Sequence, residues 1–286
     1  MSPAPTVTTR EERLAARRRR SRRSMAVAAV STVVVLGALA AVVLTSPGWP
    51  TVRRTFFSSS EFSNVFSGVL SGFWLDVRMF MITEVIVLAV GLVIAVVRTT
   101  RVPALFPLRM LAVVWTDLFR GVPTIIVVYI VGFGVPALHL SGVPTSPVVL
   151  GCAALTMCYS AYVSEVFRAG IDSVHPSQAA AALALGLTRG QTMRLVIVPQ
   201  AVRRVLPPLL NDFIALQKDV ALISFLGPQE AFRAAQIFNA YNFNYTPLMA
   251  AALLYLCVTI PFTRYTDFLL DRARRQRGGE LALGPR

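Results

Sequence analysis

The chain has 286 residues, of which 55% are hydrophobic and 15% are charged, against about 25% charged in an ordinary soluble domain. Its mean hydropathy is +0.62, which excludes disordered, collagen-like and coiled-coil proteins and predicts an integral membrane protein. The net charge of +14 comes from 28 basic residues against 14 acidic ones, and Lys218 is the single lysine. Such a charge fits either nucleic-acid binding or the basic cytoplasmic loops of a membrane protein.

Six segments are predicted to span a membrane, because a spanning helix needs roughly 20 apolar residues. The first has no charge, and the fifth is the most heavily charged. In chain order they are residues 25–45, 80–97, 123–140, 147–163, 205–226 and 247–262. The first segment could also belong to a signal peptide, but its length and the lack of an A-x-A cleavage site favour an uncleaved helix.

Arginine is concentrated on one side of these spans. The leader holds eight arginines between residues 10 and 23, and the loops and tail on the same side hold four, five and six. The opposite-side loops hold three. Cytoplasmic segments of membrane proteins collect Lys and Arg, so both termini are predicted to lie in the cytoplasm. Because the charge is spread over a leader and several loops without interleaved aromatics, topology explains it and nucleic-acid binding does not.

The sequence carries no signature of covalent chemistry. It lacks a G-x-x-x-x-G-K-[ST] phosphate loop and an H-E-x-x-H metal motif, and its only histidines, His139 and His175, lie far apart. The three cysteines lie inside apolar runs without metal-type spacing, which is typical of buried hydrophobic residues. We therefore expect no enzyme activity, no metal and no cofactor in this chain.

The loop after the fourth span has a helical pattern of its own. Pro176 suits a first helical turn, residues 178–185 are rich in alanine, and Gly186 is free to adopt the positive φ that ends a helix. A second short helix, residues 189–198, is expected to follow. A short exposed helix with small side chains is either a surface linker or an element that enters a cleft in a partner protein.

The same loop resembles the EAA loop of bacterial ABC importer permeases, which reads E-A-A-x-x-x-G-x9-I-x-L-P. The matching positions here are Ala180, Ala181, Ala182, Gly186, Val196, Val198 and Pro199, with Gln178 two residues before them. Segments 117–123 and 161–170 are similar to the E-L-F-R-G-T-P and A-Y-x-x-E-x-x-R-G-G motifs of the polar amino acid branch. The resemblance covers about residues 75–271.

This resemblance implies an all-α permease in a cell membrane with a cytoplasmic coupling helix, which falls between helices four and five of the six predicted transmembrane helices. The first of the six is extra relative to the five-span members of the family. Its expected partners are ABC ATPase subunits, a solute-binding protein, the lipid bilayer and a second permease subunit. The implied function is import of a polar amino acid such as glutamate, glutamine, arginine or histidine. The expected parts are a disordered basic leader, an extra N-terminal helix, an external loop, the importer transmembrane domain and a cytoplasmic tail, at residues 1–24, 25–45, 46–74, 75–271 and 272–286.

Two positions depart from the family pattern. The Glu of the loop motif falls on Ala180, and the Thr and Ser that usually follow Lys-Asp fall on Val220 and Ala221. The first departure removes an acidic contact to the ATPase subunit and favours a heterodimer with a sister permease that keeps the Glu, although a homodimer is also compatible with the sequence. Because of the second departure, the residues that contact substrate in relatives cannot be carried over to this chain.

Charges inside the predicted spans are candidates for function. Lys218 and Asp219 lie mid-span, where a charge costs roughly 2.5–3.5 kcal/mol, so each needs a partner or a wet cavity. One interpretation is a structural ion pair, with Glu84 as a possible partner of Lys218, and the other is contact with substrate. Glu165 and Arg168 share one helix face, and together with Arg120 they either form surface pairs or brace the coupling loop.

A polar and aromatic cluster lies in the predicted external loop after the fifth span. Its members are Asn239, Tyr241, Asn242, Asn244 and Tyr245. Amides with aromatic rings suit the membrane interface, and they also suit docking of a solute-binding protein.

Two other classes of protein remain as alternatives. An ATPase-independent secondary transporter or channel would be expected to have an internal inverted repeat, which is not visible in the sequence. A membrane-embedded enzyme would need a clustered nucleophile, base or metal set, which two distant histidines do not provide.

The arginine distribution makes topology testable with reporter fusions. Fusions after Thr55 and after Ala240 should report an external location, and a fusion after Gln191 a cytoplasmic one. A cytoplasmic signal at Thr55 would contradict the six-span arrangement.

Overall fold

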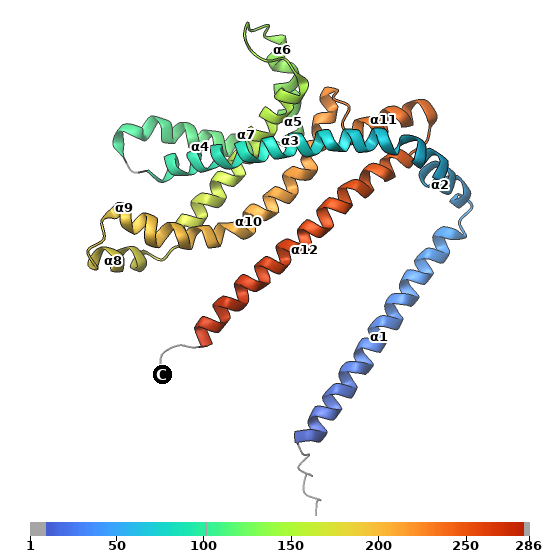
Figure 1. Ribbon diagram of the computed structural model, residues 1–286, viewed down its shortest axis with the longest axis horizontal. Coiled ribbons are helices and arrows are strands. Elements are labelled where there is room, and N and C mark those ends of the chain that lie inside the picture. Colours follow the sequence, from blue (N-terminus) through green and yellow to red (C-terminus); the bar gives the residue numbers. More distant parts are fainter. Residues whose placement is uncertain (1–9, 101, 283–286) are drawn as a thin grey trace, which may run out of the picture. The chain divides into compact units, whose positions relative to one another are not determined.

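The computed structural model describes residues 10–100 and 102–282, and the side chains of residues 24–100 and 102–270. These residues form helices joined by loops, with no strand among them (Figure 1). The chain divides into two compact units, Met1–Thr55 and Phe56–Arg286.

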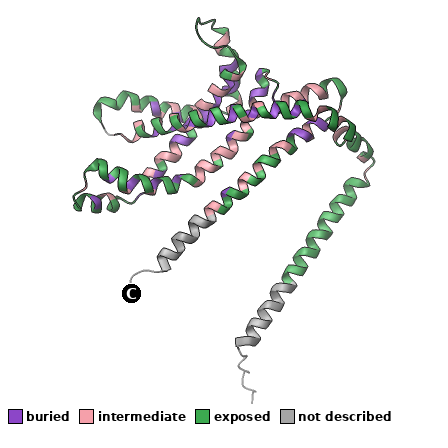
Figure 2. Cartoon of the chain, in the orientation of Figure 1, coloured by how far each residue is buried: buried purple, intermediate pink, exposed green. Residues whose placement is uncertain are grey.

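The first unit is built on helix α1 (Arg10–Leu44), which is followed by α2 (Trp49–Phe56). Every residue from 24 to 44 is exposed (Figure 2). A helix with apolar side chains exposed on all sides is suited to contact with lipid. The helix predicted for residues 25–45 is confirmed and begins earlier, because the Arg, Ala, Glu and Leu residues of 10–24 are good helix formers. The rest of the predicted leader, residues 1–9, lies outside the described residues.

The second unit is a helical bundle. Its long helices are α3 (Ser59–Thr99), α4 (Phe106–Gly121), α7 (Pro147–Asp172), α10 (Val198–Asp219), α11 (Ala231–Asn242) and α12 (Thr246–Ala282). The shorter elements are η1 (Pro103–Leu105), α5 (Thr124–Tyr129), η2 (Ile130–Gly134), α6 (Val135–Ala137), α8 (Pro176–Ala184), α9 (Arg189–Thr192), η3 (Met193–Ile197) and η4 (Val220–Leu226). Helix α3 begins inside the segment predicted as an external loop, and α12 extends into the predicted tail.

Four helices of the described chain are long and apolar enough to cross a membrane, or five if one bent pair is a single span. The bent pair is Pro103–Gly121 with Thr124–Ala137, which meet at 109°. Val122 is extended there because the ring of Pro123 disfavours a helical conformation in the residue before it. The predicted third span therefore corresponds to the second arm of this pair, and α4 forms a helix where a loop was predicted. Helix α10, the predicted fifth span, is not among the four.

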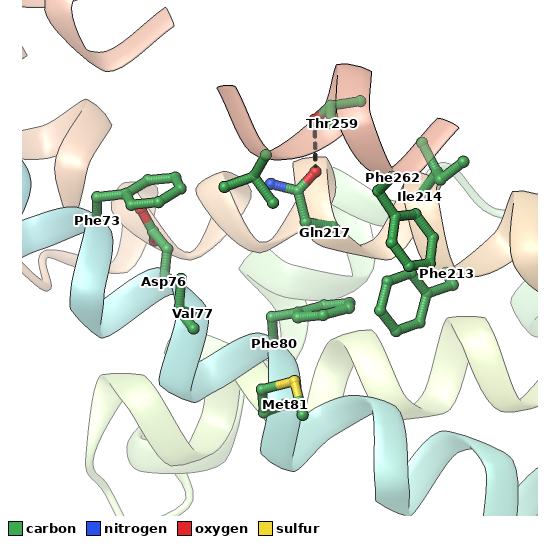
Figure 3. Close-up of a pocket in the computed structure, with 11 residues that line it drawn as sticks. Phe73, Asp76, Val77, Phe80, Met81, Phe213, Ile214, Gln217, Thr259 and Phe262 are labelled. Carbon is green, nitrogen blue, oxygen red and sulfur yellow. Dashed lines mark hydrogen bonds between the residues drawn. The ribbon is translucent and has the colours of Figure 1, made fainter. Parts of the chain in front are cut away.

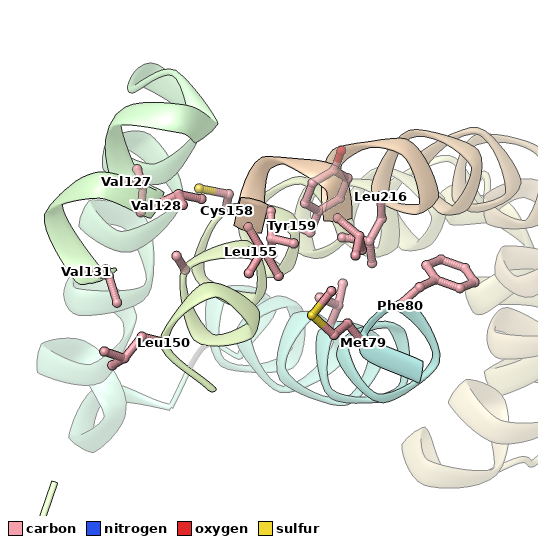
Figure 4. Packing of buried hydrophobic residues seen from close by; sticks show 14 of the residues in the cluster. Met79, Phe80, Val127, Val128, Val131, Leu150, Leu155, Cys158, Tyr159 and Leu216 are labelled. Atoms are coloured by element: carbon pink, nitrogen blue, oxygen red, sulfur yellow. The ribbon is translucent and has the colours of Figure 1, made fainter. Parts of the chain in front are cut away.

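The core lies where α7 packs between α3, α10 and η4 (Figure 4). Leu155, Leu216 and Ile223 are completely buried there. Helices α3 and α7 approach closely at Gly91, where a Cβ atom would lie 2.7 Å from Cγ1 of Val163. The absence of a side chain at Gly91 thus lets two long helices meet at backbone distance, which stabilises helix pairs in lipid.

A second close crossing joins α3 to the start of α11. A Cβ atom on Gly72 would lie 2.5 Å from the carbonyl carbon of Glu230 and 2.6 Å from the nitrogen of Ala231. Backbone atoms cannot rotate away as a side chain can, so the two helices would have to separate.

We expect Gly72→Ala to lower the melting temperature of the detergent-purified protein by about 5 °C or more, since overpacking costs about 1–3 kcal/mol. Gly68→Ala, one turn earlier on α3 with nothing within 4 Å, is the matched control. It should leave the melting temperature unchanged or raise it, because Ala favours a helix more than Gly does. Equal shifts for both variants would contradict the close crossing.

Candidate functional site

One carboxylate holds three helices together at the end of the bundle where α3 ends. Glu165 on α7 accepts a hydrogen bond from Nη1 of Arg98 on α3 at 2.7 Å and from Nε of Arg168 at 2.8 Å. Nη1 of Arg120 on α4 lies 3.5 Å from the same carboxylate. The side chains of Glu165 and Arg98 are only 18% and 12% exposed, so this pair is largely shielded from solvent. The structure thus brings together the three predicted candidates Arg120, Glu165 and Arg168 and adds Arg98.

The loop after α7 has the helical form that its sequence predicts. Helix α8 begins at Pro176, and the Nδ1 atom of His175 accepts a hydrogen bond from the backbone N–H of Ser177. The helix ends at Ala184, and Gly186, two residues later, has a φ of +86°. The N–H groups of Gly186 and Leu187 donate to the carbonyls of Leu183 and Ala182, which is the Schellman arrangement that a positive-φ glycine permits.

This loop is fixed to the bundle on one side. Val174, Ile197 and Ala201 form a small buried cluster against which Ala179 packs. Nη1 of Arg204 on α10 donates a hydrogen bond to the backbone carbonyl of Ser173. The loop therefore moves with α7 and α10 rather than independently of them.

The other side of α8 is free of contacts from the described chain. Ala182 is 4% exposed and faces the bundle, whereas Ala180, Ala181 and Ala184 are exposed. At about 100° per residue, Ala180 and Ala184 lie nearly opposite Ala182 and Ala181 lies beside Ala184, so the three form one face with almost no side-chain bulk. We call Ala180, Ala181 and Ala184 the alanine face.

Two features of α8 were not predicted. Leu185, at its end, is 84% exposed and is the most exposed large hydrophobic side chain described. The side chain of Gln178 is exposed, and its Oε1 accepts a hydrogen bond from Nε2 of Gln200 on α10 at 3.4 Å.

The charged residues in the middle of the bundle differ in whether another side chain contacts them. Lys218 is exposed and forms no salt bridge with any described residue, so the suggested pair with Glu84 is not formed. Asp219 accepts a hydrogen bond from the hydroxyl of Tyr159 at 2.9 Å. Glu84 is only 9% exposed and lies close enough to Asp212 for the two carboxylates to repel each other. Neither Asp212 nor Tyr159 was singled out from the sequence.

A further acidic pair lies at the start of α11. The Glu230 carboxylate accepts hydrogen bonds from the N–H groups of Phe232 and Arg233, at 2.7 and 2.6 Å, and so caps the helix. Asp76 on α3 is 3% exposed and accepts hydrogen bonds from the hydroxyl of Tyr255 and the N–H of Ala231. Burial, and then the nearby Asp76 carboxylate, raise the pKa of Glu230 above its usual range.

Asp76 lines a cavity of about 230 Å³ between α3, α10 and α12 (Figure 3). Most of its wall is apolar and aromatic. Its polar side chains are Asp76, Gln217 and Thr259. No group of three or more His, Cys, Asp or Glu side chains in the described part of the chain has the arrangement of a metal site.

The fold is shared with membrane transport proteins. Residues 102–275 match the family model described as a binding-protein-dependent transport system inner membrane component. The arginine transport system permease protein ArtQ of Bacillus subtilis (strain 168) is 31% identical over 68% of this chain and 87% of its own length. A probable glutamine ABC transporter permease protein, GlnM, of the same organism is 31% identical over 73% and 95%.

Solved structures agree with these relatives. A chain from the crystal structure of an amino acid ABC transporter with histidines superposes with a TM-score of 0.66 and 29% identity. It covers 76% of this chain and 98% of its own. A chain of the inward-facing MetNI methionine ABC transporter, at 19% identity and a TM-score of 0.53, has the same fold.

Together these observations define a helical permease subunit of an ABC importer. The chain belongs to the family of binding-protein-dependent transport system inner membrane components.

The shielded Glu165–Arg98 pair should contribute more stability than the other ion pairs at this end of the bundle. Glu165→Gln leaves the Arg98 guanidinium without its charge partner, so we expect a loss of about 2–3 kcal/mol, measured by thermal unfolding in detergent. Asp172→Asn is the control, because Asp172 is 57% exposed and pairs with Arg168 alone. Its substitution should cost about 0.5 kcal/mol or less. An equally small effect of Glu165→Gln would contradict the bracing role.

Proposed function

We propose that this chain is the translocating subunit of an ATP-driven importer for a polar amino acid. The observation that carries the proposal is the alanine face of α8, exposed on a loop that is fixed to α7 and α10. Two relatives named above are arginine and glutamine permeases, which supports an amino acid as cargo. Because ATP hydrolysis belongs to separate subunits, family membership argues against the ATPase-independent transporter as an alternative.

The alanine face would enter a cleft of an ATPase subunit. Small side chains let two backbones approach closely, and the exposed Leu185 adds an apolar anchor beside them. When ATP closes the ATPase subunits, the displacement of α8 would pass to α7 and α10. The bundle would then alternate between outward and inward access.

Ala180 belongs to this face and replaces the acidic residue of the family motif. Docking through this subunit would therefore depend on fit rather than on a charge-assisted contact. A sister permease that keeps the acidic residue would supply the missing contact, which favours a heterodimer over a homodimer.

Helix α10 is proposed as the fifth of six spans, with both termini in the cytoplasm. Its exposed residues Arg204, Asn211 and Lys218 recur every seven residues, so they share one face. Against lipid such a face would be costly. Facing a second permease subunit across a hydrated pathway avoids that cost.

A solute-binding protein would dock at the opposite end of the bundle. Tyr241 and Phe243, at the end of α11, are both 82% exposed. Exposed aromatic rings are enriched in protein interfaces and also at membrane surfaces. The end of α11 could therefore contact both the binding protein and the membrane surface.

The function can be tested with the complex reconstituted in liposomes from this chain, its sister permease if one exists, the ATPase subunits and the binding protein. We expect uptake of a labelled polar amino acid that requires both ATP and the binding protein. Uptake that persists without the ATPase subunits would contradict the proposal.

Docking of α8 can be tested by bulk alone. Ala181→Trp places a large ring on the alanine face without a clash inside the chain, so the protein should reach the membrane while binding-protein stimulation of ATPase activity falls at least about tenfold. Ala181→Ser is the size-matched control and should keep the stimulation. A cysteine at Ala181 that never crosslinks to the ATPase subunit, in any nucleotide state, would exclude the coupling role.

A further inference from the structure

The cavity between α3, α10 and α12 has an aromatic wall that surrounds one buried acid. The rings of Phe73, Phe80, Phe213 and Phe262 line it, and Figure 3 shows Phe73 beside Asp76 and the other three rings grouped beyond the amide of Gln217. Phe80 and Phe213 meet edge to face at 4.6 Å, and Phe213 stacks on Phe262 at 4.5 Å. These contacts fix the rings, so the wall is preorganised.

Asp76 has bonding capacity that the protein does not use. Its Oδ2 atom accepts from the Tyr255 hydroxyl at 2.8 Å and from the Ala231 N–H at 3.3 Å, but its buried Oδ1 atom has no partner. The residue is 97% buried, since 3% of its surface is exposed. A buried carboxylate without a positive partner is strongly unfavourable, and no residue lining the cavity is basic.

The aromatic wall favours the same kind of ligand as the acid. Each ring face carries partial negative charge and attracts a cation within about 6 Å of the ring centre. Carboxylate and ring faces together make a site for a guanidinium or ammonium group, whereas a neutral side chain would leave Asp76 unpaired.

Gln217, a second polar side chain of the cavity, can donate a hydrogen bond to a carboxylate. Gln217 accepts a hydrogen bond from the Thr259 hydroxyl at 2.8 Å through Oε1, which leaves its Nε2 atom as a donor. A free amino acid with a cationic side chain has both charges that these two ends of the cavity complement.

The acidic character continues beyond the aromatic layer. Glu84 lies one helical turn after Phe80 on the same face of α3, and Asp212 on α10 lies close enough to Glu84 for the two carboxylates to repel each other. Glu84 is 91% buried, as 9% of its surface is exposed, and an Oδ2 atom of Asp212 is buried without a partner. A cation that passed the rings would therefore meet a second negative site.

We propose that this cavity recognises the cationic side chain of the transported substrate, which makes the importer selective for basic amino acids of the arginine or lysine class. The inference rests on the proposed import function and narrows its substrate. Asp76 pairs with the cation, the phenylalanine rings contact its face, and Glu84 with Asp212 receives it next.

Comparing the binding of arginine with that of citrulline distinguishes recognition of charge from recognition of shape, because citrulline is the neutral analogue of arginine. We expect arginine, and not citrulline, to bind the detergent-purified full chain in calorimetry. Asp76→Asn keeps the size and one acceptor oxygen and should weaken arginine binding at least about tenfold. Asp267→Asn, an exposed acid on α12 outside the cavity, should bind arginine as the wild type does. Equal binding of arginine and citrulline, or unchanged arginine binding by Asp76→Asn, would overturn the proposal.

A second variant covers the case in which Asp76→Asn does not fold. Phe213→Leu removes a ring but keeps an apolar wall, and it should weaken arginine binding about 3- to 30-fold. Unchanged binding by this variant would also count against the site.

The reconstituted complex separates the inference from the function on which it rests. Binding-protein-dependent uptake of a neutral or acidic amino acid, without arginine or lysine, would refute the cationic site and leave the importer intact. The absence of uptake for every amino acid would instead refute the import function.

Discussion

Charge inside an apolar solvent is the constraint on which this structure depends. A charged side chain that faces lipid costs several kcal/mol, so each charge within the bundle needs a counter-charge, a hydrogen bond or water. Glu165 meets this requirement with guanidinium groups from α3, α4 and α7. Asp219 meets it with the Tyr159 hydroxyl. Asp76, Glu84 and Asp212 meet it only in part, and for that reason they are the residues with capacity left for a ligand.

The same constraint explains why the two faces of α10 carry different residues. Its buried face carries Leu216 into the core and Asp212 toward Glu84, whereas its exposed face carries Lys218. A helix so divided fits poorly in lipid on its own, and α10 is not among the described helices that are long and apolar enough to cross a membrane by themselves. Its place in the bundle depends on α3 and α7 on one side and, in our proposal, on a second subunit on the other.

Local sequence rules predicted the elements that local physics controls. Pro176 and Gly186 gave the start and end of α8, and the uncharged run after Met25 gave the apolar part of α1. The bend after Val122 was not predicted, although the predicted third span begins at Pro123, the residue that causes it. The predictions were wrong or missing where a side chain contacts a distant part of the chain. Glu84 was suggested as a partner of Lys218 only because both are charged residues in predicted spans. No local pattern relates Asp76 to Tyr255, 179 residues later.

The loop helices have one mechanical consequence. Helix α9, η3 and α10 form an unbroken helical run from Arg189 to Asp219, which at about 1.5 Å per residue is a rod of roughly 45 Å. Pro207 and Pro208 remove backbone hydrogen-bond donors near its middle, which is where such a helix can kink. A push on the α8 end would therefore reach the Gln217 end as a tilt rather than a slide, and a tilt of α10 changes the gap to α3 and α12, the two helices that complete the cavity wall.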